Sequence, residues 1–246
     1  MNRKNPTSRG SKNPVQAQRR HDLLVRGALT AVVVVFAVVV GAVLIARHHT
    51  SDTPQATPAS VTDTGAIRAV SPSVATAPGT NSPKAVLTVY EDFQCPVCKN
   101  FEAGFGDTID QLRTSGAVAV DYHPISILDR MSSTQYSTRA ANASLCVADT
   151  GIDNWLAFHR SVYQQQPPEG GSGLTDQQMI DLATAAGAPE SVAACITDGR
   201  YTEWVASSTQ SVLDTGVSAT PTVLLNGEPV SLSTPAALAA AVAAIG

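Results

Sequence analysis

Two of the four cysteines in this chain are separated by only two residues, in the segment Cys95-Pro96-Val97-Cys98. Thiols at this spacing can close a small disulfide or present one reactive thiolate. An apolar run, residues 85–90, ends just before the pair, and a helical pattern begins just after it. The first sulfur is therefore expected at a helix N-terminus, where free backbone N–H groups and the helix dipole favour an anion and lower the pKa of a thiol. This setting favours dithiol redox chemistry.

The elements that must position this pair form a strand–helix–strand unit. After Cys98, apolar residues recur three and four positions apart as far as Leu112, which predicts an amphipathic helix that ends near Gly116. Residues 117–122 then have the pattern of a strand. In such a unit the two strands are expected to pair in parallel, and the helix to form a right-handed crossover between them.

Helical periodicity follows from about Met131 to Thr215, and the chain then returns to a strand pattern. The predicted helices cover 136–149, 153–164, a segment from Thr175 to Gly187, a segment starting near Pro189, and 201–216. Strands at 221–225 and 229–232 flank Asn226-Gly227, a strong hairpin signal, and Thr234-Pro235 begins a last helix. This order predicts an α/β fold that resembles a thioredoxin core with an all-helical domain inserted in it.

The N-terminal region predicts a membrane anchor. Residues 27–46 are uncharged and Val-rich, and 20 residues at about 1.5 Å each match a hydrocarbon core of roughly 30 Å. Residues 1–26 hold seven basic residues and one acid, so the positive-inside rule places this tail in the cytoplasm and the rest of the chain outside. The alternative is a cleaved signal peptide, but the apolar run is too long and residues 44–47 lack a small-x-small site.

Residues 47–83 are rich in Ser, Thr, Ala and Pro, and are expected to form mostly a tether because they cannot bury enough apolar surface to offset the entropy of ordering. An edge strand at 66–70 is the expected exception. Residues 84–130 and 216–246 would form the thioredoxin-like core, and 131–215 the inserted helical domain.

The charge of the chain differs between its two parts. It holds 16 basic and 20 acidic residues, a net charge of −4; residues 1–49 contain 8 and 1 of these, so residues 50–246 carry 8 − 19 = −11. An acidic domain lacks the basic surface that nucleic acid requires. We interpret the acidic residues as a solvated surface and expect no nucleic-acid partner.

Four segments resemble the DsbA-like thiol–disulfide oxidoreductases, and the anchor together with the four cysteines resembles the membrane-tethered members of that family from high-GC Gram-positive bacteria. The four segments are residues 90–98, 155–159, 173–176 and 216–222. The resemblance covers about residues 84–246 and implies that Cys95 is the exposed attacking sulfur and Cys98 the buried resolving sulfur. Thr220-Pro221 would form a cis-proline loop against the motif, and Pro96 and Val97 complete the motif. No cofactor beyond the Cys95–Cys98 disulfide is expected.

The expected function is the oxidation of exported proteins through a mixed disulfide at Cys95. A quinone-linked membrane partner of the vitamin K epoxide reductase-like type would reoxidise the domain. The same fold could instead work as a reductase or isomerase; Pro96, Gln94 and the four-cysteine pattern favour oxidation. A copper-delivery protein is a further alternative, because Cu(I) can be held by two thiolates. A scaffold without redox activity is disfavoured by the intact motif.

Cys146 and Cys195, 49 residues apart, are expected to form a structural disulfide in an oxidising compartment, the alternative being two buried free thiols. Val89 stands where relatives of this family often bury a carboxylate for proton transfer. Glu91 and Asp92 are near enough to substitute, but we interpret them as solvated surface. His159 is expected to pack in the core, and His123 to have no chemical role.

Overall fold

The computed structural model describes residues 55–245. The predicted cytoplasmic tail at 1–26 and the predicted anchor at 27–46 lie outside these residues. Within the described part of the chain, none of the helices is long and apolar enough to cross a membrane.

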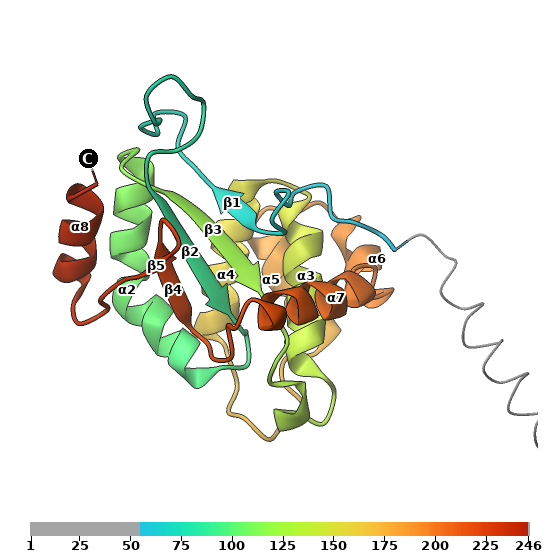
Figure 1. Ribbon diagram of the computed structural model, residues 1–246. Helices are drawn as coiled ribbons and strands as arrows, with labels where there is room; N and C mark the ends of the chain where they lie inside the picture. Colours follow the sequence, from blue (N-terminus) through green and yellow to red (C-terminus); the bar gives the residue numbers. More distant parts are fainter. Residues whose placement is uncertain (1–54, 246) are drawn as a thin grey trace, which may run out of the picture. The chain divides into compact units, whose positions relative to one another are not determined.

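A mixed sheet in the order β1-β3-β2-β4-β5 lies at the centre of the domain (Figure 1). The central strand β2 (Val86–Glu91) pairs in parallel with β3 (Ala119–Pro124), and α2 (Pro96–Thr114) forms the connection between them. On its other side β2 pairs antiparallel with β4 (Thr222–Leu225). The strand–helix–strand unit predicted around the cysteine pair is therefore present, with α2 beginning directly after Cys95.

Two short strands form the edges of the sheet. β1 (Ile67–Ala69) pairs antiparallel with β3, within the expected edge strand. β5 (Glu228–Pro229) pairs antiparallel with β4 across the Asn226-Gly227 turn, and is shorter than the strand predicted at 229–232. α8 (Pro235–Ala243) follows, capped by the Thr234 side chain, and packs against α2.

The expectation of a tether is wrong for residues 55–83. The Gln55 amide donates to the Ser207 hydroxyl at 2.8 Å, and the Ser60 N–H donates to Asp149 at 2.9 Å. Ile67 in β1 is 1 % exposed. This segment has few large apolar residues, but its polar groups form hydrogen bonds within turns and with distant residues, and β1 joins the sheet. Residues 47–54 lie outside the described residues.

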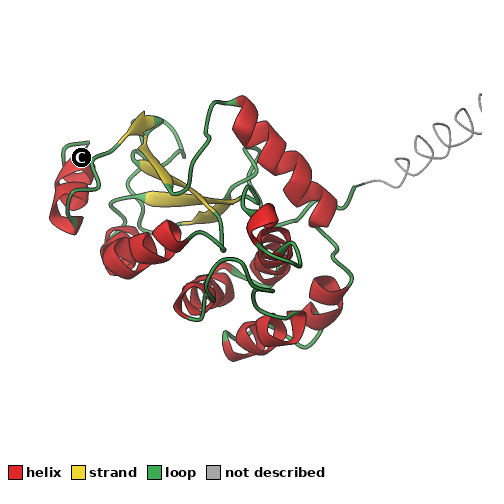
Figure 2. Cartoon of the chain, turned by 90° about the horizontal axis from the view of Figure 1, so that it is seen from below, coloured by secondary structure: helices red, strands yellow, loops and turns green. Residues whose placement is uncertain are grey.

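The helical part of the domain is built around α3. Its elements are the 3₁₀ turn η1 (Asp129–Met131), α3 (Tyr136–Ala148), α4 (Ile152–Gln164), α5 (Asp176–Ala185), α6 (Val192–Thr197) and α7 (Thr202–Asp214). α3 contacts α4, α5, α6 and α7, which explains why eleven of its thirteen residues are buried. Figure 2 shows helices on both sides of the sheet. α5 begins with the predicted capping box of Thr175 and Gln178. α4 and α2 pack together on one face of the sheet, where Trp155 of α4 contacts Tyr122 of β3.

Candidate active site

The cysteine pair lies at the junction of β2 and α2. Cys95 is the N-cap residue of α2, and its N–H closes a turn with the Asp92 carbonyl at 2.9 Å. Pro96 lies in the first turn of the helix, where no N–H donor is needed. Both cysteines are free thiols in this structure.

The two thiols have opposite pKa shifts. A hydrogen bond from the Cys98 thiol lowers the pKa of Cys95 to about 6, aided by the Thr220 side chain and by the backbone N–H groups of Cys98 and Val97, while burial opposes this effect. Burial raises the pKa of Cys98 strongly, and its hydrogen bond to Cys95 and the charge of Glu91 add to the rise. The site therefore favours a thiolate on Cys95 and a thiol on Cys98.

Cys95 is less exposed than the resemblance implies. The residue is 5 % exposed and Cys98 is 2 % exposed, whereas Val97 between them is 59 % exposed. The reason is the loop before β4: the Cys95 thiol donates to the Thr220 carbonyl oxygen at 3.3 Å. Cys95 is thus only slightly more accessible than Cys98, and the exposed residue of the motif is its neighbour Val97.

The Thr220-Pro221 peptide bond is cis, as expected. Both residues are partly buried, and Pro221 directly precedes β4. Thr222, the first residue of β4, pairs with Tyr90 of β2, close to the end of the strand that leads to Cys95. The topology of the sheet therefore brings the proline loop to the cysteine pair, although 125 residues separate Cys95 from Thr220.

Gln166, a residue that the sequence did not single out, holds the segment before α2. Its side-chain amide donates to the carbonyl oxygens of Phe93 at 2.7 Å and Cys95 at 3.0 Å. Its own backbone carbonyl accepts a hydrogen bond from Lys99 Nζ at 3.1 Å. Gln166 follows α4, so the helical domain directly supports the backbone of the cysteine motif. Nothing in the local pattern distinguishes it from its neighbour Gln165.

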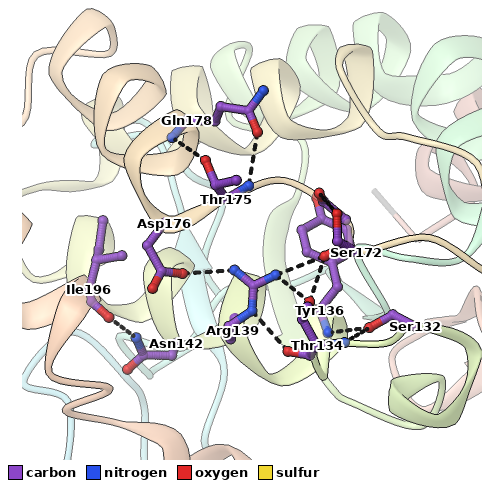
Figure 3. Close-up of polar contacts among 11 residues, drawn as sticks. Ser132, Thr134, Tyr136, Arg139, Asn142, Ser172, Thr175, Asp176, Gln178 and Ile196 are labelled. Atoms are coloured by element: carbon purple, nitrogen blue, oxygen red, sulfur yellow. Dashed lines mark hydrogen bonds and ion pairs between the residues drawn. The ribbon is translucent and has the colours of Figure 1, made fainter.

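The loop that contains Gln166 is held by Arg139 of α3 (Figure 3). The guanidinium donates to the Ser172 carbonyl at 3.0 Å, to the Thr134 carbonyl at 2.9 Å and hydroxyl at 2.7 Å, and to Asp176 at 2.7 Å. Gly173 lies next in the loop with φ +69°, and a Cβ there would lie 2.1 Å from the Tyr136 ring. These contacts fix the conformation of a loop that is rich in Gly and Pro.

Asp92 is buried, so its interpretation as solvated surface is wrong. The residue is 0 % exposed, and its carboxylate accepts hydrogen bonds from Gln94 N–H at 2.9 Å, Ser137 Oγ at 2.7 Å and Leu128 N–H at 3.0 Å. Burial raises the pKa of Asp92 to about 6 despite these bonds. Its hydrogen bonds join the turn before Cys95 to α3 and to the loop after β3. The carboxylate is buried because it lies between these three segments.

Glu91 is also buried, at 3 % exposure, because it is the last residue of the central strand and points toward α4. Its carboxylate oxygens lie 2.8 and 3.0 Å from His159 Nε2. His159 packs among the rings of Phe93, Tyr122, Trp155 and Tyr163, as the core interpretation expected. The sequence did not predict its pairing with Glu91.

The other singled-out residues lie apart from this site. Cys146 of α3 and Cys195 of α6 form a disulfide with a Cα–Cα distance of 5.9 Å. His123 stacks on Tyr90, and burial lowers its pKa to about 4, which keeps the ring neutral near pH 7. Among residues 55–245, no group of three or more His, Cys, Asp or Glu side chains is arranged to hold a metal ion.

Comparison with known proteins agrees with this geometry. The family model described as thioredoxin matches residues 75–244, well over half of the chain, so the chain belongs to the thioredoxin family. Within that family it is DsbA-like. DsbA from Mycobacterium tuberculosis in its reduced form is 43 % identical, with a TM-score of 0.68 over 73 % of this chain and 91 % of that chain. DsbG from the same organism is 44 % identical, with a TM-score of 0.69 over 73 % of this chain and 86 % of that chain.

More distant similarities are of two kinds. MdbA from Actinomyces oris is 22 % identical, with a TM-score of 0.61 over 76 % of this chain and 91 % of that chain, and shares the fold. The serine/threonine-protein kinase PknE of M. tuberculosis is 31 % identical over 126 residues, which are 49 % of this chain and 22 % of the kinase. The chain thus spans about a fifth of the length of the curated relatives it matches.

Proposed function

We propose that this chain is a thiol–disulfide oxidoreductase that works as a DsbA-like oxidase. The observation that carries the proposal is the asymmetry of the two thiols: Cys95, at the N-terminus of α2 and beside the cis-proline loop, has a lowered pKa, and Cys98 has a raised one. A thiolate is the nucleophile and the better leaving group in disulfide exchange. The similarity to mycobacterial DsbA supports the same conclusion.

The proposed reaction begins with the Cys95–Cys98 disulfide. A client thiolate attacks Cys95 Sγ, the bond to Cys98 breaks, and Cys98 leaves as a thiolate that takes up a proton. A second client thiolate then attacks the client sulfur of the mixed disulfide, and Cys95 leaves as a thiolate. The client loses two electrons and two thiol protons and gains a disulfide, while the enzyme is left in its dithiol form.

The direction of exchange follows from the stability of the dithiol form. Stabilising the Cys95 thiolate stabilises the reduced enzyme, which makes its disulfide a stronger oxidant. A reductase or isomerase of the same fold is the second candidate, since DsbG, named a disulfide bond oxidoreductase, is as similar to this chain as DsbA is.

The proposal extends to location and partners. The apolar segment 27–46 and the basic residues before it support a membrane anchor with the catalytic domain outside the cytoplasm. The clients would be exported proteins with free thiols. A quinone-linked membrane protein of the vitamin K epoxide reductase-like type would reoxidise the enzyme, because each turnover leaves Cys95 and Cys98 reduced.

Oxidative folding of reduced, denatured ribonuclease A tests this function. The oxidised domain, residues 55–246, should restore ribonuclease activity faster than glutathione disulfide at the same concentration of disulfide. Cys95→Ser and Cys98→Ser should each abolish this gain, because neither variant can form the Cys95–Cys98 disulfide that a client thiolate attacks. Equal rates with the wild-type domain and the Cys95→Ser variant would contradict the proposal.

A further inference from the structure

One side chain of the helical part of the domain reaches the peptide of the attacking cysteine. Gln166, in the loop after α4, is 8 % exposed, and its amide donates to the carbonyl oxygens of Phe93 at 2.7 Å and Cys95 at 3.0 Å. The Cys95 carbonyl oxygen also accepts a hydrogen bond from the Lys99 N–H of α2 at 3.2 Å. This oxygen therefore joins the start of α2 to the loop after α4.

Gln166 is itself held from two sides. Its N–H donates to the Tyr163 carbonyl near the end of α4 at 3.2 Å, and its carbonyl accepts a hydrogen bond from Lys99 Nζ at 3.1 Å. Pro167 and Pro168 follow directly, and a proline ring fixes the backbone φ at about −65°. The backbone of Gln166 is therefore a fixed point from which the amide reaches the two carbonyl oxygens.

The direction of the Cys95 carbonyl matters to the thiol because both groups belong to one residue. Cys95 has an extended backbone, with φ −71° and ψ 119°, directly before the helical residues of α2. The N–H groups of Val97 and Cys98 contribute to the lowered pKa of Cys95. A carbonyl that loses its donor is free to turn, and the thiol then moves relative to these N–H groups.

We propose that Gln166 is a positioning residue of the redox centre, which holds the Cys95 peptide so that the thiolate faces the N–H groups of α2, and that Lys99 holds Gln166 in place. This proposal rests on the function proposed above and deepens it. The N–H groups stabilise a charge that only the reduced form carries, since the disulfide form has no thiolate. Gln166 therefore favours the dithiol form, which makes the disulfide a stronger oxidant.

Two titratable groups face Cys95 and are the same whatever residue occupies position 166. Cys98 on α2 donates a hydrogen bond to the thiolate, and the charge of the buried Asp92, in the turn after β2, opposes a charge on Cys95. In the described part of the chain, the hydrogen bonds of Gln166 go to backbone groups and to Lys99, not to these two side chains. Replacement of Gln166 by another neutral residue therefore changes the position of the thiol and not the charge around it.

The equilibrium of the protein with glutathione measures the effect of Gln166. One glutathione disulfide takes two electrons and two thiol protons from the dithiol, so that the protein disulfide and two glutathione thiols form. At pH 8, Gln166→Met, which is similar in length but has no donor, should raise the equilibrium constant of this oxidation about tenfold, the equivalent of one pKa unit. The ultraviolet absorbance of the thiolate should show the pKa of Cys95 rising from about 6 by about one unit. Gln165→Met, at an exposed neighbour, is the matched control and should change neither value.

A double-variant cycle tests the role of Lys99. Lys99→Met should raise the equilibrium constant by a smaller factor, because the Gln166 amide is still present. If Lys99 acts through Gln166, the double variant should behave like Gln166→Met alone, whereas a direct effect of the Lys99 charge on the thiolate would add to it. Additive effects would overturn the role assigned to Lys99.

Urea denaturation of the oxidised and the reduced protein separates positioning from structural support. Structural support alone would stabilise both forms equally, so its loss would leave the equilibrium constant unchanged. An unchanged constant in Gln166→Met, with or without a loss of stability, would overturn the proposal. Gln166→Asn, whose amide is one methylene shorter, should shift the constant in the same direction and provides the same test if Gln166→Met does not fold. Failure of the wild-type protein to exchange with glutathione would instead contradict the proposed oxidoreductase function.

Discussion

Cys95 gathers its stabilising contacts from two parts of the chain. The Cys98 thiol and the first N–H groups of α2 come from its own helix, and Thr220 comes from the loop before β4. The contacts from α2 follow from two thiols spaced three positions apart at a helix start, so the sequence predicted them. The contact from Thr220 depends on the sheet order, and only the resemblance to a family indicated it.

Alkylation of Cys95 should therefore depend on pH in a way that an ordinary thiol does not. Because the lowered pKa is about 6, the rate of reaction of the reduced protein with iodoacetamide should rise from pH 5 and level off above pH 7. An ordinary thiol, with a pKa of about 8.5, would still be rising at pH 8. The Cys98→Ala variant removes the largest stabilising contact, the hydrogen bond from the Cys98 side chain, and should move the midpoint upward. A midpoint above pH 8 in the wild-type protein would contradict the described geometry.

Gln166 is a residue of the site that the local sequence pattern could not predict. Its side chain donates hydrogen bonds to two carbonyl oxygens, although it lies in a loop 71 residues after Cys95. Glutamine is common on protein surfaces, so the residue type alone does not indicate this role. Asp92 and Glu91 were misjudged for a related reason: acidic side chains after a strand are usually solvated, and only the packing of α3 and α4 over β2 buries these two.

Replacement of Gln166 by alanine should weaken both the fold and the site. Two carbonyl acceptors would lose their donor in a buried place, at a cost of about 1–3 kcal/mol in the free energy of unfolding. The reactivity of Cys95 should fall as its backbone becomes less constrained. Urea denaturation and the iodoacetamide rate measure the two effects, with Gln165→Ala, an exposed neighbour, as the control. If the two variants behave alike, the support assigned to Gln166 is wrong.

At the scale of elements, the periodic segments were predictable and the irregular ones were not. The helices from α2 to α8 begin and end close to their predicted bounds, because each carries an apolar face, and α5 also has the capping box of Thr175 and Gln178. The Asn226-Gly227 turn located the β4–β5 hairpin. Residues 55–83 were misjudged because their order comes from hydrogen bonds and turns, such as that of Gln55 to Ser207, which leave no hydrophobic period.

The disulfide between α3 and α6 should stabilise the helical domain without serving the chemistry. It closes a loop of 49 residues, which on the loop-entropy model stabilises the fold by about 4 kcal/mol. The double variant Cys146→Ser, Cys195→Ser should lose about this amount in urea denaturation while its Cys95 alkylation profile stays unchanged. A loss below about 1 kcal/mol, or a shifted alkylation midpoint, would contradict a purely structural role.

For the whole molecule, the lowered pKa of Cys95 links redox state to stability. A thiol whose pKa is lower in the folded than in the unfolded state adds stability that is fully present above the unfolded value, about 8.5, and is lost as the pH falls through the folded value, about 6. The thermal midpoint of the reduced protein should therefore rise relative to that of the oxidised protein between pH 6 and pH 8.5. A difference between the two midpoints that does not change between pH 6 and pH 8.5 would contradict this linkage.

The reduction potential of the Cys95–Cys98 couple tests the central claim most directly. Equilibration of residues 55–246 with glutathione redox buffers at pH 7 measures it, with the disulfide of Cys146 and Cys195 left intact. An oxidase requires a value above about −150 mV, near that of strong oxidants such as DsbA. A value near or below about −250 mV, close to that of thioredoxin, would contradict the oxidase proposal and assign the same site to a reductase.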